Sequence, residues 1–216
     1  MKVYNYFRSS TSYRVRIALH LKGLSFDYVG VDLRTGAQKD EAFAQLNPHQ
    51  TLPTLVSGDT VLSQSLAIMD WLEEHYPEPS LWPGDPVDKQ TCRELYYAIA
   101  TEIHAPNNLP VLNYLRQEFE LDQAGLGRWN ETWMHRTFAP VERRLVAQEW
   151  RSEDLPFGKP TFFEIVLIPQ ISNARRWNVD LSPFPNLVRI DAYCQTLDSF
   201  KSAHPDVQPD AMEASS

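Results

Sequence analysis

The chain has 216 residues, 43% of them hydrophobic, which is enough for one large or two small domains with a buried core. Its formal net charge of −8 repels nucleic acid and anionic membranes. It lacks the run of roughly 18 apolar residues that a transmembrane helix needs, and it begins without a signal-peptide pattern, which predicts a cytoplasmic protein. Its cysteines, Cys92 and Cys194, lie outside any C-x-x-C pair, which argues against a disulfide framework or a metal site.

The first part of the chain combines a short strand, a run of hydroxyl side chains and a helix. Residues 3–7 are predicted to form the strand, and the helix has apolar residues at helical spacing and ends at Gly23. The hydroxyl run between them comprises Ser9, Ser10, Thr11 and Ser12. The first N–H groups of a helix lack partners and the helix dipole is positive there, so this pattern favours binding of an anion or a thiolate. An ordinary capped helix would show the same pattern.

The remainder of the first eighty residues alternates strands with helices. Strands are predicted at 28–31, 55–56 and 61–62, and helices at 40–46 and 65–76. This order predicts a mixed sheet with helices on its faces, in which the first helix forms the right-handed crossover between the first two strands. Ser65 is placed to cap the helix at 65–76, and Leu52-Pro53 suits a turn before the third strand.

A proline-rich segment at residues 77–86 marks a linker, beyond which the strand signals fade. Thr161 and Glu164 have the spacing of a capping box. From Pro205 the chain is expected to be ordered at first and then frayed. The sequence therefore predicts an α/β domain at residues 1–80 and an all-α domain at residues 87–210. Helices of the second domain are predicted at 87–105, 108–119, 123–148, 161–176 and 186–203.

Several segments together resemble the zeta class of glutathione transferases. They are residues 6–19 (YFRSSTSYRVRIAL), 21–23 (LKG), 46–48 (LNP), 52–55 (LPTL), 64–68 (QSLAI), 166–170 (VLIPQ) and 173–181 (NARRWNVDL). The resemblance runs through almost the whole chain, and its serine-rich start with the RVRIAL helix is highly specific. It implies the glutathione transferase fold, which is an α/β thioredoxin-like domain followed by an all-α domain. It also implies a homodimer that binds glutathione at the junction of the two domains.

The resemblance implies an enzyme that isomerises maleyl diketo acids, such as maleylacetoacetate or maleylpyruvate, in the breakdown of aromatic compounds. In this reaction the glutathione thiolate adds to the cis double bond, the resulting single bond rotates, and elimination returns glutathione with the trans product. A thiol with a pKa of about 8.5 is mostly protonated at neutral pH, so the protein must stabilise the thiolate. Ser9 matches the catalytic serine of the family, and its hydroxyl would stabilise the thiolate by donating a hydrogen bond, together with the helix dipole.

The same matching implies the other site residues. Ser10 and Thr11 complete the catalytic cluster, although the family often has cysteine where Thr11 stands, which leaves Thr11 the role of a weaker donor. The implied glutathione site consists of Ser9, Ser10, Thr11, Ser12, Tyr13, Arg14, Gln38, His49, Leu52, Pro53, Gln64, Ser65, His104 and Asn108. Leu52, before a cis Pro53, would pair its backbone with the cysteinyl unit. Gln64 and Ser65 would hold the γ-glutamyl carboxylate, and Gln38 and His49 the glycyl end.

Arg8 and Arg176 are the candidate clamps for substrate carboxylates, because a guanidinium offers paired donors in carboxylate geometry. A surface ion pair is the alternative for Arg176. His104 and Asn108 share one helix face only if the helix continues through Pro106. Residues 103–108 resemble the Ile-His-x-x-Asn-Asn pattern of the maleylpyruvate branch, but that branch tends to have arginine where Pro110 stands, so the substrate stays open.

Two other functions stay open at this point. Conjugation or dehalogenation of small electrophilic acids would use the same thiolate, and a non-enzymatic module would hold glutathione without turning over a substrate. In each case the expected partner is a small molecule, and neither nucleic acid nor a membrane is expected.

Overall fold

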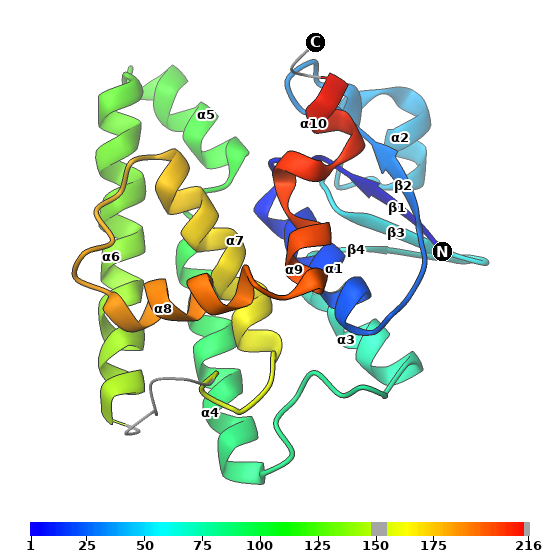
Figure 1. Ribbon diagram of the computed structural model, residues 1–216. Helices are drawn as coiled ribbons and strands as arrows, with labels where there is room; N and C mark the ends of the chain where they lie inside the picture. Colours follow the sequence, from blue (N-terminus) through cyan, green and yellow to red (C-terminus); the bar gives the residue numbers. More distant parts are fainter. Residues whose placement is uncertain (148–154, 214–216) are drawn as a thin grey trace. The chain divides into compact units, whose positions relative to one another are not determined.

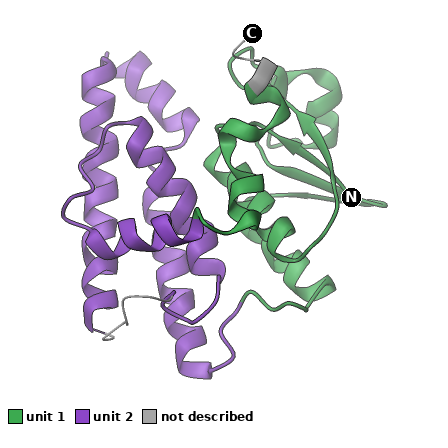
Figure 2. Ribbon diagram, viewed as in Figure 1, with its two compact units in different colours: residues 1–81, 195–216 green, residues 82–194 purple. Residues whose placement is uncertain are grey.

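The computed structural model describes residues 1–147 and 155–213, and the chain divides into two compact units (Figures 1 and 2). Unit 1 comprises residues 1–81 together with the C-terminal segment from residue 195, and unit 2 comprises residues 82–194. The predicted second domain, at residues 87–210, therefore differs from unit 2, because the chain rejoins the first unit after Cys194. Among the described residues, no helix is long and apolar enough to cross a bilayer.

Unit 1 is built on a mixed sheet with the strand order β2-β1-β3-β4. Its strands are β1 (Lys2–Asn5), β2 (Asp27–Gly30), β3 (Thr54–Ser57) and β4 (Thr60–Ser63). β1 pairs parallel with β2 and antiparallel with β3, and β3 pairs antiparallel with β4. Val3 lies opposite both Tyr28 and Leu55 in this register. The mixed sheet predicted from the order of the elements is thus confirmed, with a helical crossover between the two parallel strands.

The other regular elements of unit 1, among its described residues, are helices. They are α1 (Ser10–Leu21), η1 (Ala37–Lys39), α2 (Glu41–Leu46), α3 (Ser65–His75), α9 (Asp198–Ala203), η3 (Pro205–Val207) and α10 (Pro209–Glu213). α1 is buried from Thr11 to Leu19 and packs against α3 and α9. It ends just before Gly23, whose φ of 64° is the left-handed conformation that glycine adopts without strain. α2 packs Phe43 edge-on against Tyr4 of β1, with ring centroids 5.7 Å apart.

The segment that follows α3 is anchored to unit 1 by a buried ion pair. Lys22 has a fully buried side chain, and its Nζ lies 2.7 Å from Oε2 of Glu73. The same ammonium donates to the carbonyls of Tyr76 at 2.6 Å and Pro79 at 3.1 Å, while Glu73 accepts from the Ser80 hydroxyl at 2.6 Å. The first part of the proline-rich linker is therefore fixed to α1 and α3.

The regular elements of unit 2 are all helices among its described residues. Its elements are α4 (Pro86–Tyr97), the π-helix η2 (Ala98–Ile103), α5 (Leu109–Glu118), α6 (Gln123–Ala147), α7 (Phe162–Arg176) and α8 (Pro185–Cys194). α7 is buried along most of its length and contacts α4, α6 and α8. Its predicted capping box is confirmed, because the Thr161 N–H donates to Glu164 and the Phe163 N–H donates to the Thr161 hydroxyl. The predicted end of α6 at residue 148 lies outside the described residues.

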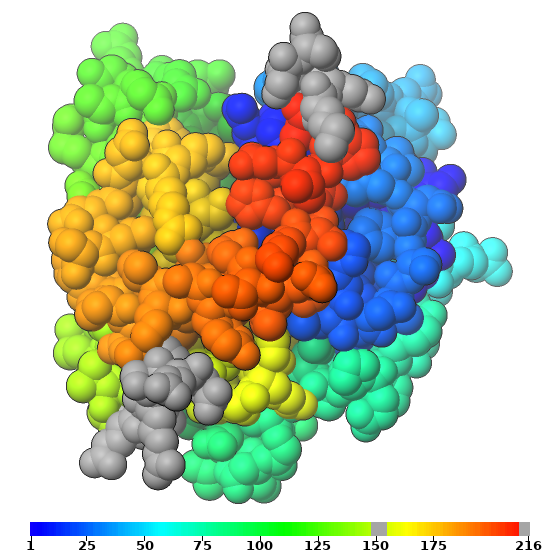
Figure 3. Space-filling model, in the orientation of Figure 1, coloured from blue at the N-terminus to red at the C-terminus, as the bar shows by residue number. Residues whose placement is uncertain are grey.

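The C-terminal part of the chain departs from the prediction. The helix predicted at 186–203 is wrong, because α8 ends at Cys194 and α9 begins only after Leu197, whose backbone is extended. This break lies where the chain passes from unit 2 to unit 1, and residues 186–203 contain no proline or glycine that would mark it. Pro205–Val207 and Pro209–Glu213 form the short helices η3 and α10, and the frayed end predicted beyond them lies outside the described residues. The space-filling view shows the red C-terminal residues lying directly against the blue residues of the same unit (Figure 3).

Candidate active site

The predicted catalytic serine lies at the junction of a tight turn and α1. Residues 6–9 form this turn, which is closed by the Ser9 N–H donating to the Tyr6 carbonyl at 3.0 Å. Ser9 is also the N-cap of α1, and its Oγ accepts from the Ser12 N–H at 3.2 Å. By sequence, the first turn of α1 carries no acidic side chain that would neutralise the helix dipole. A negative group next to Ser9 would therefore meet the positive end of the helix dipole and a hydroxyl.

A chain of hydrogen bonds connects Ser9 to the residue before the cis proline. The Thr11 hydroxyl donates to the Leu52 carbonyl at 2.9 Å, and the Ser9 and Thr11 hydroxyls lie 2.9 Å apart. Because the single hydroxyl proton of Thr11 goes to Leu52, the Ser9 hydroxyl donates to Thr11. The Leu52-Pro53 peptide is cis. Thr11 thus accepts from Ser9 and donates to Leu52, while its donor role towards a bound thiolate stays a prediction.

The start of α3 approaches α1 through a buried arginine. Arg14 is 1% exposed, and its Nη1 donates to the Ser65 hydroxyl at 3.4 Å. The sequence predicted Ser65 as the N-cap of α3, and this is wrong. Ser65 is the first helical residue, and Gln64 takes the cap position. Gln64 has a φ of 70°, which is strained for a residue with a side chain and costs about 1–3 kcal/mol. Strain of this kind is typical of ligand sites.

The remaining predicted residues of unit 1 lie in different surroundings. Gln38, in η1, is half-buried, and its amide oxygen is buried without a hydrogen-bond partner among the described residues. His49 is exposed, and its backbone N–H donates to Asn47 at 3.0 Å. The Tyr13 ring is buried and meets the His204 ring edge-on at 6.0 Å, so this side chain packs against the C-terminal segment. Arg8 is exposed, and its guanidinium lies 5.0 Å from the centre of the Phe7 ring.

Three predicted site residues belong to unit 2. The helix does not continue through Pro106, since η2 ends at Ile103, and His104 lies half-buried in the turn that follows. Asn108 is the N-cap of α5, where its side chain accepts from the Val111 N–H at 3.0 Å. The condition for a shared helix face of His104 and Asn108 is therefore not met, and the Asn108 side chain caps α5. Arg176 is exposed at the end of α7 and donates to the Asn173 side chain.

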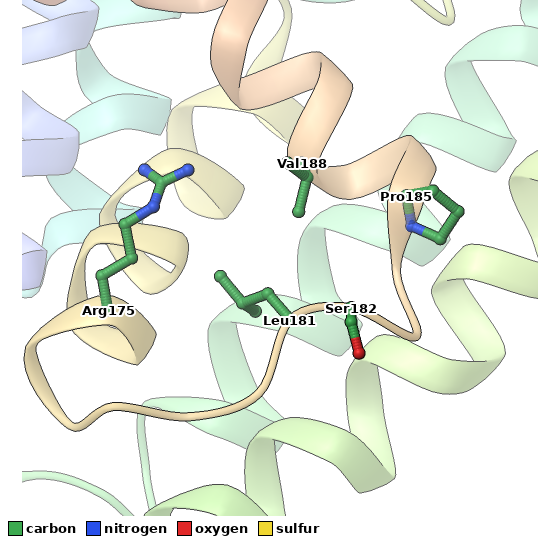
Figure 4. Close-up of a pocket in the computed structure, with 5 residues that line it drawn as sticks. All are labelled: Arg175, Leu181, Ser182, Pro185 and Val188. Atoms are coloured by element: carbon green, nitrogen blue, oxygen red, sulfur yellow. The ribbon is translucent and has the colours of Figure 1, made fainter.

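A pocket of about 420 Å³ lies in unit 2 next to the end of α7 (Figure 4). It is lined by Arg175, Leu181, Ser182, Pro185 and Val188. Its arginine is Arg175, which is paired at 2.5 Å with the buried carboxylate of Asp191. None of the lining residues belongs to the predicted site, so this pocket does not correspond to the predicted carboxylate clamp.

Both cysteines are buried and unsuited to act as nucleophiles. Burial raises the pKa of the Cys92 thiol to about 11, and burial also raises the pKa of Cys194 well above its usual range. Each thiol stays protonated at neutral pH, whereas the thiolate is the reactive form. Both cysteines therefore behave as apolar core residues.

The structure also identifies two residues near Ser9 that the sequence patterns did not single out. Arg16 is fully buried and donates to the Phe7 carbonyl at 3.1 Å. Asp210 accepts from the Phe7 N–H at 2.9 Å, although it lies 203 positions away in the sequence. Arg16 could have been found from the sequence, because it is the second arginine of the RVRIAL stretch, whose other residues are apolar. No local pattern distinguishes Asp210.

Known proteins resemble this chain over almost its full length. Residues 3–80 match the family described as the N-terminal domain of glutathione S-transferase. A maleylpyruvate isomerase from Ralstonia sp. is 42% identical over 98% of this chain and 100% of its own length. A holo structure of a maleylpyruvate isomerase, a bacterial glutathione S-transferase of the zeta class, is 43% identical with a TM-score of 0.94, covering 98% of this chain and 100% of its own.

A maleylacetoacetate isomerase from Anaeromyxobacter dehalogenans 2CP-1 has been solved with dicarboxyethyl glutathione and citrate in its active site. It is 35% identical with a TM-score of 0.84, and the match covers 97% of this chain and 93% of the other. These matches confirm the glutathione transferase fold predicted from the sequence. With its serine-capped first helix, its cis proline before β3 and this full-length similarity, the chain belongs to the zeta class of the glutathione transferases.

Proposed function

We propose that the protein is a glutathione-dependent cis–trans isomerase of maleyl diketo acids, such as maleylpyruvate or maleylacetoacetate. The observation that carries the proposal is the position of the Ser9 hydroxyl, at the N-cap of α1 and within hydrogen-bond distance of Thr11. The position provides a hydrogen-bond donor and a helix dipole for a thiolate, but no base. Relatives that match 98% of this chain are named as isomerases of such a substrate, which supports the same activity here.

Two observations in unit 1 support glutathione as the ligand. The buried amide oxygen of Gln38 has no partner among the described residues, and a bound ligand would supply one. Gln64 is held in a strained conformation directly before the first N–H groups of α3, where a carboxylate is stabilised. Together with the backbone of Leu52, these groups would hold the tripeptide. When bound, glutathione supplies a thiolate that adds to the double bond, permits rotation about the resulting single bond and leaves again.

Within this proposal, Ser9 lowers the pKa of the bound thiol by donating its hydroxyl proton to the thiolate. To do so the hydroxyl must turn away from Thr11, to which it donates in the present structure. Thr11 remains hydrogen-bonded to Leu52 and keeps the end of α1 next to the residue before the cis proline. A neutral hydroxyl serves here as a fixed dipole, and its contribution depends on where it is placed.

Two arginines are proposed to hold the substrate carboxylates. Arg8 directly precedes Ser9 and is exposed, and Arg176 is exposed at the end of α7. The relative from Anaeromyxobacter dehalogenans holds dicarboxyethyl glutathione and citrate, both rich in carboxylates, which supports a substrate of this class. His104 is retained as a candidate contact. Asn108 is not, because its side chain already caps α5.

We also propose that the enzyme works as a cytoplasmic homodimer, as membership of its family suggests. A homodimer would have twice the chain mass of 24.9 kDa. Light scattering coupled to size-exclusion chromatography measures this directly, and a mass of one chain would refute the dimer.

The test of the proposed reaction is a thiol balance. A maleyl substrate in large excess over glutathione is converted to completion, and total thiol is titrated before and after. Isomerisation leaves the thiol unchanged, because glutathione is regenerated. Loss of one thiol for each substrate converted would refute isomerisation and favour conjugation, and an unchanged substrate would favour a binding module. S-methyl glutathione cannot form a thiolate and should support no turnover.

A further inference from the structure

In the turn that leads to Ser9, both backbone polar groups of Phe7 are hydrogen-bonded to charged side chains. The Phe7 N–H donates to Oδ2 of Asp210 at 2.9 Å, and the Phe7 carbonyl accepts from Nη2 of Arg16 at 3.1 Å. Phe7 is the first central residue of the turn over residues 6–9. The single hydrogen bond that closes the turn does not fix how the turn is oriented on the sheet. The two bonds to Phe7 do so, and both involve a charged partner, which makes them stronger than neutral ones.

Asp210 is itself fixed in place by unit 1. Its Oδ1 accepts from the Tyr28 hydroxyl at 2.6 Å. Burial raises the pKa of Tyr28 above its usual range, so Tyr28 remains a donor at every physiological pH. A Cβ on Gly30 would lie 3.3 Å from the Cβ of Asp210, so the glycine leaves room for this approach. The next residue, Ala211, is buried in a cluster that includes Tyr6, Phe7 and Leu52.

Arg16 connects the Phe7 carbonyl to the same C-terminal segment by hydrogen bonds. It is fully buried, and its Nε donates to the Ala203 carbonyl at the end of α9 at 3.0 Å. Burial lowers the pKa of Arg16 to about 10, which leaves the guanidinium charged at neutral pH. The N–H and carbonyl of Phe7 therefore lie between the Asp210 carboxylate and the Arg16 guanidinium. Asp210 belongs to the C-terminal segment, and Arg16 is hydrogen-bonded to that segment through Ala203.

We propose that Asp210 is a positioning residue for the reaction, which sets the location of the Ser9 hydroxyl through the Phe7 peptide. The inference rests on the proposed function in one respect, namely that Ser9 is the donor to the thiolate. A misplacement of a catalytic group by about 1 Å can cost roughly a hundredfold in rate. Loss of Asp210 should therefore act on thiolate stabilisation and kcat more than on the affinity for glutathione, whose other proposed contacts are with Leu52, Gln64 and Ser65.

The test compares Asp210→Ala and Asp210→Asn with a control in the same segment, Asp206→Asn, whose side chain is 83% exposed. Two quantities are measured for each variant: kcat at saturating glutathione, and the pKa of the bound thiol, from the pH dependence of thiolate absorbance in the ultraviolet. Asp210→Ala should raise the thiol pKa towards that of free glutathione and lower kcat roughly tenfold to a hundredfold. Asp210→Asn should give a smaller change of the same sign, because its amide oxygen still accepts from Phe7. The control should stay within about twofold of the parent.

A folded Asp210→Ala variant with the thiol pKa and kcat of the control would overturn the inference. If the Asp210→Ala variant does not fold, the test rests on Asp210→Asn. A kcat and a thiol pKa of Asp210→Asn equal to those of the control would likewise overturn the inference. The thiol pKa needs no maleyl substrate. A parent protein that lowers the thiol pKa but does not isomerise such substrates would therefore refute the proposed function and still leave the role of Asp210 to be decided by the variants.

Discussion

The capping box of α7 makes the stability of the protein depend on pH through Glu164. This carboxyl is fully buried, and its Oε2 accepts from the Thr161 N–H at 2.7 Å and from the Thr161 hydroxyl at 2.6 Å. The two hydrogen bonds favour the charged form, but burial penalises the charge more strongly. The pKa of Glu164 is therefore raised from 4.5 to about 7.

The folded state thus binds this proton more tightly than the unfolded chain. The contribution of Glu164 to stability is fully present below about pH 4.5 and is lost as the pH rises to about 7, since unfolding then releases the carboxyl to ionise in water. At roughly 1.4 kcal/mol for each pH unit, the difference between 4.5 and about 7 corresponds to about 3 kcal/mol.

Glu164→Gln removes the titration while keeping a similar shape and an acceptor for Thr161. The measurement is urea unfolding of both proteins at one protein concentration, from roughly pH 5 to roughly pH 8. The free energy of unfolding of the parent, minus that of the variant, should decrease by about 2–3 kcal/mol over this range. All other titrating groups are common to the two proteins and cancel. A difference that is independent of pH would show that Glu164 titrates normally, and the reasoning from burial would be wrong.

Three further predictions concern the site and the linker. Ser9→Ala should lower kcat roughly a hundredfold, or about 2.7 kcal/mol, whereas Tyr6→Phe should change it little, and steady-state kinetics giving the opposite order would remove Ser9 as the donor. Arg176→Ala should raise KM for a dicarboxylate substrate and leave glutathione affinity, measured by calorimetry, unchanged, and equal losses would assign Arg176 to the glutathione site. Lys22→Met should reduce the free energy of unfolding by about 3 kcal/mol, because Glu73, whose side chain is only 14% exposed, loses its ion-pair partner. The exposed control Lys201→Met should change it by less than about 0.5 kcal/mol, and an equally small effect of Lys22→Met would contradict a stabilising ion pair.

The elements that the sequence predicted well are those specified by neighbouring residues. Gly23 ends α1 because a left-handed residue is needed there, and Thr161 with Glu164 starts α7 because both partners lie within one turn. The strands around the Gly58 turn were identified for the same reason. Such signals need no knowledge of the rest of the chain.

The features that the sequence could not predict depend on distant partners. Nothing near Leu197 breaks a helix, and the break follows from the passage of the chain between units. Ser65 has the composition of a cap, but the strained Gln64 takes that place. In the candidate site, the run of hydroxyls was visible in the sequence, whereas the direction of the hydrogen bond from Ser9 to Thr11 follows only from the position of the Leu52 carbonyl.

The discontinuous makeup of unit 1 has a consequence for how the protein is made. A ribosome synthesises residues 1–81 first, but Ala203 and Asp210, which accept hydrogen bonds from Arg16 and Phe7, emerge last. All of unit 2, at residues 82–194, is synthesised before them. During translation the buried guanidinium of Arg16 lacks the Ala203 carbonyl, and the N-terminal unit cannot complete its packing in the order of synthesis. A premature stop just after Cys194 would leave the sequence of the helical unit whole and take away the support of the turn that carries Ser9.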